Sequence, residues 1–182
     1  MRVVAGSVRG FNLIVPSGKN TRPTTNRIKE TLFNILQWDI AGCRFLDLFS
    51  GSGGIAIEAL SRGAKEAVMV EKDREAVRCI KQNVQHTKMD DRSRVMPMDV
   101  MQALRRLEQA GRPFDIIFMD PPYQLNAEKE VLTAIADSKI ADEDTQIIIE
   151  ATLDREFSED ELACFDVVRV KEYKTNKHIF LQ

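Results

Sequence analysis

Short apolar runs alternate with amphipathic segments along most of the chain. Between residues 43 and 151, five runs have the length of strands, and the segments between them repeat apolar positions every three to four residues, as helices do. The strand-like runs are CRFLDLF, AVMVE, RVMPM, FDIIFMD and QIIIEA. This alternation is typical of right-handed βαβ units, so it predicts a parallel sheet with helices on both faces.

The two ends of the chain depart from this alternation. Residues 164–182 contain two strand-like runs around the turn KTNK, which predict a hairpin with at least one antiparallel strand. At the N-terminus, VVAGSVRGFNLIV predicts a small β-hairpin or curled strand, and TTNRIKETLFNILQW predicts a helix capped by Thr24 or Thr25. We therefore predict an α/β fold in two parts, a basic extension at residues 1–40 and an α/β domain at residues 41–182.

The composition is that of an ordinary globular chain. Its 182 residues are 43% hydrophobic and 30% charged, which suits one domain with a sizeable core. No stretch approaches the roughly 18 to 20 apolar residues of a membrane-spanning helix, so we expect a cytoplasmic protein. The three cysteines are widely spaced, and with only two histidines no cluster has zinc-ligand spacing. We expect neither a disulfide nor a metal site.

Positive charge is concentrated at the N-terminus. Residues 1–29 hold six Lys or Arg and no acid, whereas the remaining 153 residues carry 20 basic against 28 acidic residues, a net charge of −8. Such an arm is either a solvated extension or a surface that binds a polyanion. The charge pattern alone leaves both interpretations open.

The first motif with chemical content is LDLFSGSGGIAIEAL, residues 46–60, in which a strand leads through a glycine loop into a helix. Gly51 and Gly53 let the backbone approach a ligand, and free N–H groups at the start of the helix point toward it. The motif predicts a nucleotide-like pocket at the carboxyl edge of the sheet. It also fits the dinucleotide fingerprint G-x-G-x-x-A, and Glu71 follows Gly51 by 20 residues, so an NAD-linked oxidoreductase or nucleotide-binding module stays open here.

Three carboxylates near strand ends narrow the choice of ligand. Glu71 ends the run AVMVE, where it can accept two hydrogen bonds from a ribose diol or cap the next helix as an exposed acid. Asp99 follows RVMPM and is placed to hold an adenine amino group, to cap the next helix, or to do both. Asp47 lies inside a strand, where an anion suits a cationic amino-acid moiety better than a pyrophosphate. This favours S-adenosylmethionine over NAD.

The run FDIIFMD ends in the tetrapeptide DPPY, residues 120–123. Pro121 and Pro122 stop the strand, fix the backbone and remove two N–H donors. The Asp120 carboxylate and a following carbonyl can then accept both hydrogens of an exocyclic NH₂ group on a base, which frees the nitrogen lone pair to attack a methyl sulfonium. Tyr123 offers a flat face on which a flipped base can stack. These four residues are the predicted catalytic site.

Together the motifs resemble a known family. The pair LDLFSGSGG and DPPY is similar to the amino-methylating S-adenosylmethionine-dependent methyltransferases, and MRVVAGSVRGFNLIVP with RPTTNRIKETLFNIL resembles the bacterial 16S ribosomal RNA guanine-N2 methyltransferases of the RsmD type. The resemblance covers essentially the whole chain. It implies a Rossmann-like class I fold, with a mainly parallel seven-stranded sheet and an antiparallel strand from the C-terminal hairpin. DNA adenine-N6 methyltransferases share DPPY and remain the alternative, although this chain is short for a second domain that reads DNA.

The resemblance also implies roles for the residues already named. It places the cofactor at the three carboxylates and the glycine loop, and the target amine at DPPY. The segment RPTT would fold over the cofactor, with Arg22 and Thr25 at the edge of the pocket. The basic N-terminus would contact phosphates of 16S ribosomal RNA, within the small subunit or an assembly intermediate. The implied RNA contacts are Arg2, Arg9, Lys19 and Arg22.

Overall fold

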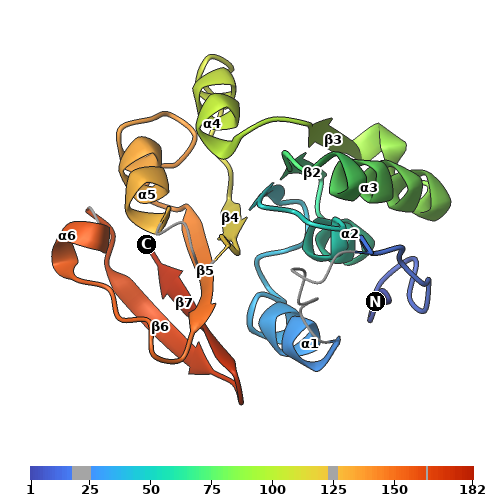
Figure 1. Cartoon of the computed structure of the whole chain (residues 1–182), viewed down its shortest axis with the longest axis horizontal. Helices are drawn as coiled ribbons and strands as arrows, with labels where there is room; N and C mark the ends of the chain where they lie inside the picture. Colours follow the sequence, from blue (N-terminus) through green and yellow to red (C-terminus); the bar gives the residue numbers. More distant parts are fainter. Residues whose placement is uncertain (18–25, 123–126, 163) are drawn as a thin grey trace.

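The computed structural model of the chain describes residues 1–17, 26–122, 127–162 and 164–182, which form a sheet with helices on both faces (Figure 1). In this part of the chain the sheet has seven strands, in the order β3-β2-β1-β4-β5-β7-β6. Neighbours from β3 to β5 run parallel, whereas β7 is antiparallel to both β5 and β6. The strands are β1 (Arg44–Leu48), β2 (Glu66–Val70), β3 (Ser93–Met96), β4 (Ile116–Met119), β5 (Gln146–Thr152), β6 (Val167–Glu172) and β7 (Asn176–Leu181).

The predicted fold class is confirmed. All five strand-like runs form parallel strands, and the two runs around KTNK form the hairpin of β6 and β7. Every residue of β4 is buried, because helices cover both faces of the central strands. The prediction of a mainly parallel sheet with an antiparallel C-terminal strand therefore holds.

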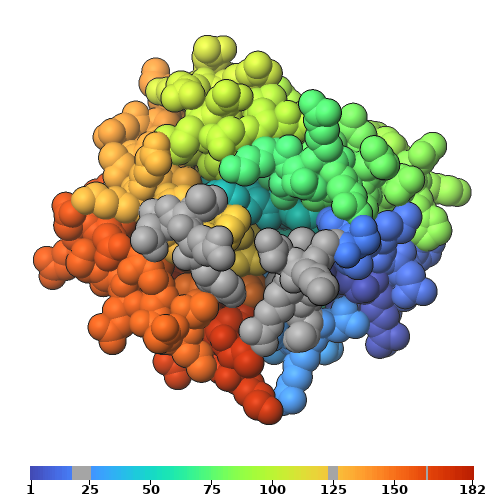
Figure 2. All heavy atoms as spheres, viewed as in Figure 1, coloured from blue at the N-terminus to red at the C-terminus, as the bar shows by residue number. Residues whose placement is uncertain are grey.

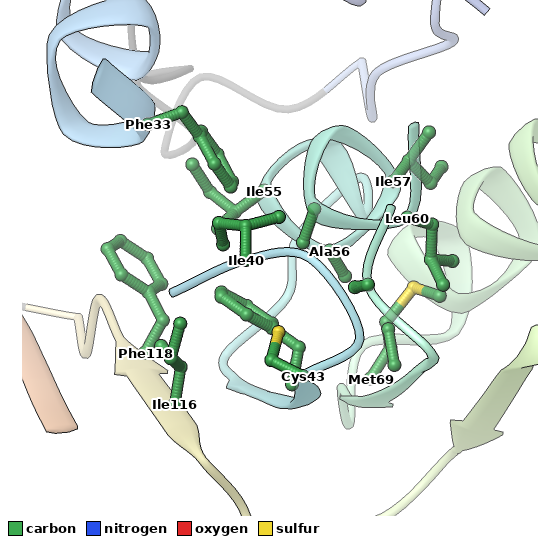
Figure 3. Close-up of a cluster of buried hydrophobic side chains, with 14 of the residues drawn as sticks. Phe33, Ile40, Cys43, Ile55, Ala56, Ile57, Leu60, Met69, Ile116 and Phe118 are labelled. Carbon is green, nitrogen blue, oxygen red and sulfur yellow. The ribbon is translucent and has the colours of Figure 1, made fainter. Parts of the chain in front are cut away.

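The helices form two layers against the sheet. On one face, called here the first face, α1, α2 and α3 pack against the sheet, and side chains such as Phe33, Ile57 and Phe118 meet there (Figure 3). On the opposite face, α4 and α5 bury residues such as Leu104 and Leu132. The helices are α1 (Asn26–Ile35), α2 (Gly54–Ser61), α3 (Arg74–Thr87), α4 (Val100–Glu108), α5 (Glu128–Ala136) and the short α6 (Glu159–Leu162), with a 3-10 turn at Asp90–Arg92.

The N-terminal segment lies against α2 instead of forming an independent hairpin. An antiparallel bridge joins Arg2 and Asn12, and backbone hydrogen bonds from Val3 to Phe11 and from Leu13 to Met1 flank it, which agrees with the predicted small hairpin. Beyond this pairing, the Glu58 carboxylate of α2 accepts the backbone N–H groups of Val4 and Ala5, at 2.8 and 2.9 Å. The predicted capping residues Thr24 and Thr25 of α1 lie outside the described residues.

The segment also contributes to the core of the domain. Val3 and Leu13 are buried in the same hydrophobic cluster as Phe45 of β1. Gly6 has a φ of +86° and lies so close to the end of α2 that an added Cβ would meet the Ser61 carbonyl oxygen at 1.9 Å. Only glycine fits there, because both the backbone angle and the close approach exclude a side chain.

Within the described ranges, no helix has the length and apolar composition required to cross a bilayer. The same residues include no cluster of three or more His, Cys, Asp or Glu side chains suited to hold a metal ion.

Candidate active site

The carboxyl ends of β1 and β4 meet at the centre of the sheet, where the strand order changes direction. Asp47 of β1 pairs with Phe118 of β4, and β2 lies on the other side of β1. In open α/β sheets, this switch point is where ligands bind. Figure 2 shows teal atoms from the β1–α2 segment beside yellow atoms from β4 near the centre of the view. The glycine loop and the start of DPPY therefore lie at one site.

The loop between β1 and α2 turns sharply. Phe49, Gly51 and Gly53 have φ angles of 90°, 54° and 78°. At Gly53, an added Cβ would come within 3.1 Å of the Met69 sulfur, so the loop packs closely on β2. A phenylalanine at φ 90° is strained, and strained residues gather at functional sites. Phe49 was not among the predicted site residues, because a non-glycine residue with positive φ carries no sequence signal.

Glu71 holds this loop from the end of β2. Its Oε2 accepts the N–H of Gly51 at 2.9 Å, and its Oε1 accepts the N–H of Asp73 at 2.8 Å. A carboxylate has about four acceptor sites, so the partly exposed group can accept further hydrogen bonds on its open side. Glu71 therefore orders the loop and remains able to bind a diol.

Asn83 of α3 joins the loop to the N-terminal segment. The fully buried side chain donates to the Ser52 carbonyl at 2.9 Å and to the Ile14 carbonyl at 2.8 Å, and it accepts the Ile14 N–H at 2.8 Å. One amide thus fixes the loop and the arm together. Asn83 was not predicted from the sequence, where it looks like any polar residue on an amphipathic helix.

Asp47 is a buried carboxylate in β1, with 1% of its surface exposed. Burial raises its pKa to about 7, against a hydrogen bond from the Ala56 backbone that lowers it, and the charge of Glu71 raises it further. Its Oδ2 has no hydrogen-bond partner among the described residues. A buried polar atom without a partner is costly, so this oxygen is suited to accept a donor from a ligand.

Asp99 caps α4, because its carboxylate accepts the N–H of Met101 at 3.0 Å. The predicted capping role is confirmed. The side chain is exposed, so a contact to an adenine amino group remains a prediction.

Asp120 directly follows β4 and is partly buried, while Pro121 is buried and Pro122 exposed. Burial raises the pKa of Asp120 well above its usual value, and the negative charges of Glu150 and Asp47 raise it further. The strand ends before the two prolines, as predicted. Tyr123 lies outside the described residues.

Two buried ionisable side chains on β5 and β7, the strands that follow β4 in the sheet, were missed. Glu150 of β5 and His178 of β7 are 6% and 0% exposed, and His178 Nε2 lies 3.2 Å from Glu150 Oε2. The available signal was one ionisable residue inside each of the apolar runs QIIIEA and HIFL. That signal does not say which residues will be neighbours.

Among the described basic residues of the N-terminal region, one is buried. Arg2 and Arg9 are exposed, whereas Lys29 is fully buried, with its Nζ 3.0 Å from Glu58 Oε2 and 2.7 Å from the Arg2 carbonyl. Lys29 therefore pairs inside the protein. The other predicted residues of this region, Lys19, Arg22 and Thr25, lie outside the described residues.

The fold and the site define the class of protein, a Rossmann-like methyltransferase. The structure resembles that of the Escherichia coli protein yhhF, with a TM-score of 0.84 and 31% identity over 100% of this chain and 97% of that chain. At the level of the fold alone, it also resembles an RNA methyltransferase from Salinibacter ruber in complex with S-adenosyl-L-homocysteine, with a TM-score of 0.68 and 14% identity over 87% of this chain and 92% of that chain.

The family follows from the sequence comparisons. The model for the family described as conserved hypothetical protein 95 matches residues 1–182, and the chain belongs to this family. It is 34% identical to ribosomal RNA small subunit methyltransferase D of Escherichia coli strain K12, over 85% of this chain and 76% of that protein. The resemblance to the RsmD type that the motifs indicated is thereby confirmed.

Proposed function

We propose that this protein transfers a methyl group from S-adenosylmethionine to the exocyclic N2 amine of a guanine in 16S ribosomal RNA. The observation that carries the proposal is the acidic lining of the switch point. Asp47 lies near the carboxyl end of β1, Glu71 directly follows β2 and Asp120 directly follows β4, and these three strands are neighbours in the sheet. Such a lining attracts a cation and repels the pyrophosphate of a dinucleotide. The relative named as a small subunit methyltransferase supports ribosomal RNA as the substrate.

The residues present fit the proposed cofactor. The unpartnered Oδ2 of Asp47 would accept a hydrogen bond from the methionine ammonium, which would hold the buried carboxylate ionised. The remaining acceptor sites of Glu71 would bind the ribose diol, and Asp99 lies one strand further along, where the adenine would follow. When bound, the cofactor supplies an electrophilic methyl group on a sulfonium.

The chain's own residues then orient the target amine. The rigid backbone at Pro121 and Pro122 fixes the Asp120 carboxylate and a following carbonyl as a pair of acceptors for the two N–H hydrogens. Holding the nitrogen in line with the methyl group supplies most of the acceleration, and Asp120 accepts the proton that the amine loses. We propose that the ring of Tyr123 stacks on the flipped base.

We propose that residues 1–40 act as an extension that contacts RNA and covers the cofactor, while residues 41–182 carry out methyl transfer. Arg2 and Arg9 are exposed on the segment that Glu58 and Asn83 hold against the domain. Lys19, Arg22 and Thr25 complete this proposed set. An enzyme with this substrate acts in the cytoplasm, where ribosomal subunits assemble.

The second candidate within this chemistry is DNA adenine-N6 methylation, because the two acceptors proposed for DPPY would bind the exocyclic NH₂ group of adenine as well as that of guanine. The described residues form one sheet and its helices and include no separate domain for reading a DNA sequence, which favours RNA. An NAD-linked oxidoreductase is disfavoured by the acidic lining.

The test is a methyl-transfer assay with labelled S-adenosylmethionine on three substrates: deproteinised 16S ribosomal RNA, small subunits from a strain lacking this protein, and duplex DNA. Digestion and mass spectrometry identify the modified nucleoside. N2-methylguanosine from either RNA substrate supports the proposal, whereas methyladenine from DNA or no methyl transfer would refute it. Calorimetry with S-adenosylmethionine and with NAD measures the cofactor preference directly.

A further inference from the structure

Asp120, Glu150 and His178 lie side by side across three neighbouring strands. Met119, the last residue of β4, pairs with Ile149 of β5. Asp120 and Glu150 are the residues that follow this pair, and Glu150 pairs with His178 of β7. Side chains alternate along strands, so all three belong to the first face. The His178 ring meets Phe118 of that face edge to ring, with centroids 5.9 Å apart. The row begins at the proposed site and leads away from it.

Hydrogen bonds hold the Glu150 carboxylate. Asn176 Nδ2 donates to its Oε1 at 2.6 Å, and His178 Nε2 lies 3.2 Å from its Oε2. The Tyr173 hydroxyl lies 2.9 Å from the other ring nitrogen, His178 Nδ1. These contacts arrange Glu150, His178 and Tyr173 as a chain, called here the Glu150 chain, that ends at a partly exposed phenol.

The chemistry of the partners assigns the protons. An ionised carboxylate only accepts hydrogen bonds, so the Nε2 of His178 carries a hydrogen. In the neutral ring, Nδ1 is then an acceptor, which the Tyr173 hydroxyl satisfies as a donor. With these protons, each group of the Glu150 chain has a hydrogen-bond partner of the opposite kind, and the Glu150 carboxylate acts only as an acceptor.

We propose that Glu150 is a positioning residue for the reaction, whose fixed negative charge makes the neighbouring Asp120 a stronger proton acceptor. His178 and Asn176 hold this charge in place. The proposal rests on the proposed function. In the step concerned, the N2 lone pair forms the N–C bond as the C–S bond breaks and its electron pair leaves with sulfur. The N–H electron pair stays on nitrogen, and the proton passes to Asp120.

The surrounding charges agree with this role. The charges that act on Asp120 are those of Glu150 and Asp47, both negative, and with burial they raise its pKa. Two buried lysines have other partners: Lys29 pairs with Glu58, and Lys177 donates to the Leu153 carbonyl. A carboxylate with a raised pKa is a stronger base once it is ionised. The ammonium of S-adenosylmethionine would offset the negative charge of Asp47, so Glu150 would then be the main negative charge that acts on Asp120.

The first experiment measures the ionisation of Asp120 without the reaction. The apoprotein is labelled with ¹³C at aspartate carboxyls, and the signal of Asp120 is assigned by its loss in Asp120→Asn. In the wild type, we expect the titration midpoint of Asp120 to lie above the ordinary aspartate value, which is about 3.9. Glu150→Gln keeps the shape and removes the charge, so we expect the midpoint to fall by about one pH unit. Glu143→Gln, the same change at an exposed carboxylate before β5, is the matched control and should leave it unchanged.

The second experiment measures single-turnover methyl transfer against pH. Glu150→Gln should move the acidic limb to lower pH and reduce the plateau rate about tenfold, while KM for the cofactor stays constant. Tyr173→Phe keeps the ring beside His178 and should retain the wild-type limb. If Glu150→Gln leaves both the acidic limb of the rate profile and the titration midpoint of Asp120 unchanged, the role of Glu150 is merely structural and the proposal is overturned. If Glu150→Gln does not fold, a wild-type Asp120 that titrates in the ordinary range overturns the proposal. An Asp120 shift without methyl transfer would refute the proposed function and leave the coupling intact.

Discussion

Glu58→Gln tests the buried group that fastens the N-terminal segment to the domain. The Glu58 carboxylate is 0% exposed and accepts four donors: Val4 N at 2.8 Å, Ala5 N at 2.9 Å, Lys29 Nζ at 3.0 Å and Arg62 Nε at 2.9 Å. Glutamine has nearly the same shape but replaces one oxygen by an NH₂ group. In either orientation, that group faces one backbone N–H and one cation, all of them donors.

The magnitude follows from the burial of Lys29. Breaking a buried pair by removing one partner costs about 3–5 kcal/mol, because the remaining charge is left without compensation. Burial already lowers the pKa of Lys29, so part of this cost can be relieved by loss of its proton. We expect Glu58→Gln to reduce the free energy of unfolding by about 3–5 kcal/mol, which is a large share of the stability of a typical domain.

Urea unfolding followed by circular dichroism measures the change, with an m-value equal to that of the wild type as the check on two-state behaviour. The matched control is Glu30→Gln, an exposed acid on α1, which should change stability by no more than about 0.5 kcal/mol. The double variant Glu58→Gln with Lys29→Met should be more stable than the sum of the single changes predicts, because the fully buried Lys29 charge is gone and the glutamine oxygen can then face Arg62. A loss under about 1 kcal/mol, or additive single changes, would refute the reasoning.

Four further predictions concern the site. Asp120→Ala should lower the methyl-transfer rate about 10²- to 10⁴-fold while calorimetry still detects cofactor binding; near-normal turnover would remove Asp120 from the mechanism. Glu71→Ala should weaken S-adenosylmethionine by about 1.5–3 kcal/mol in calorimetry without unfolding the domain, and unchanged affinity would exclude the ribose contact. The pKa of Asp47 is raised to about 7 in the folded protein, so the folded apoprotein holds this proton more tightly than the unfolded chain does, and its stability should fall as the pH rises from about 4 to 7. Asp47→Asn should flatten this pH dependence in thermal unfolding, and an unaltered profile would contradict the prediction. Replacing Arg2 and Arg9 by serine should weaken RNA binding and reduce its salt dependence, since fewer counterions are released; an identical salt slope would leave the arm a solvated surface.

Local sequence predicted the strands well because their signal is local. A run such as FDIIFMD reports burial on both faces, and two prolines after Asp120 stop a strand in any surroundings. The glycine loop was predictable for the same reason, since Gly51 and Gly53 adopt backbone angles that other residues avoid. Phe49, which adopts such an angle without being glycine, could not be found in this way.

The burial of charge could not be predicted, because it depends on elements distant in sequence. Lys29 belonged to a run of positive residues and looked solvent-exposed. Glu58 is an acid in the helix that follows the glycine loop, and every residue of this helix, α2, is buried, because the N-terminal segment covers the side that the sheet does not. One contact between two distant segments therefore changes both residues from surface charges to a core pair.

The sequence by itself determined the order of strands and helices, the glycine loop and the DPPY segment, since each depends on periodicity or backbone restriction within a few residues. The tertiary structure alone decided which side chains are neighbours. The strand order places Asp120 beside Asp47 on one side and Glu150 on the other, and the antiparallel return of β7 brings His178 to a carboxylate 28 residues earlier in the chain. Electrostatic coupling depends on distance in space, so the ionisation of the site is a property of the folded sheet.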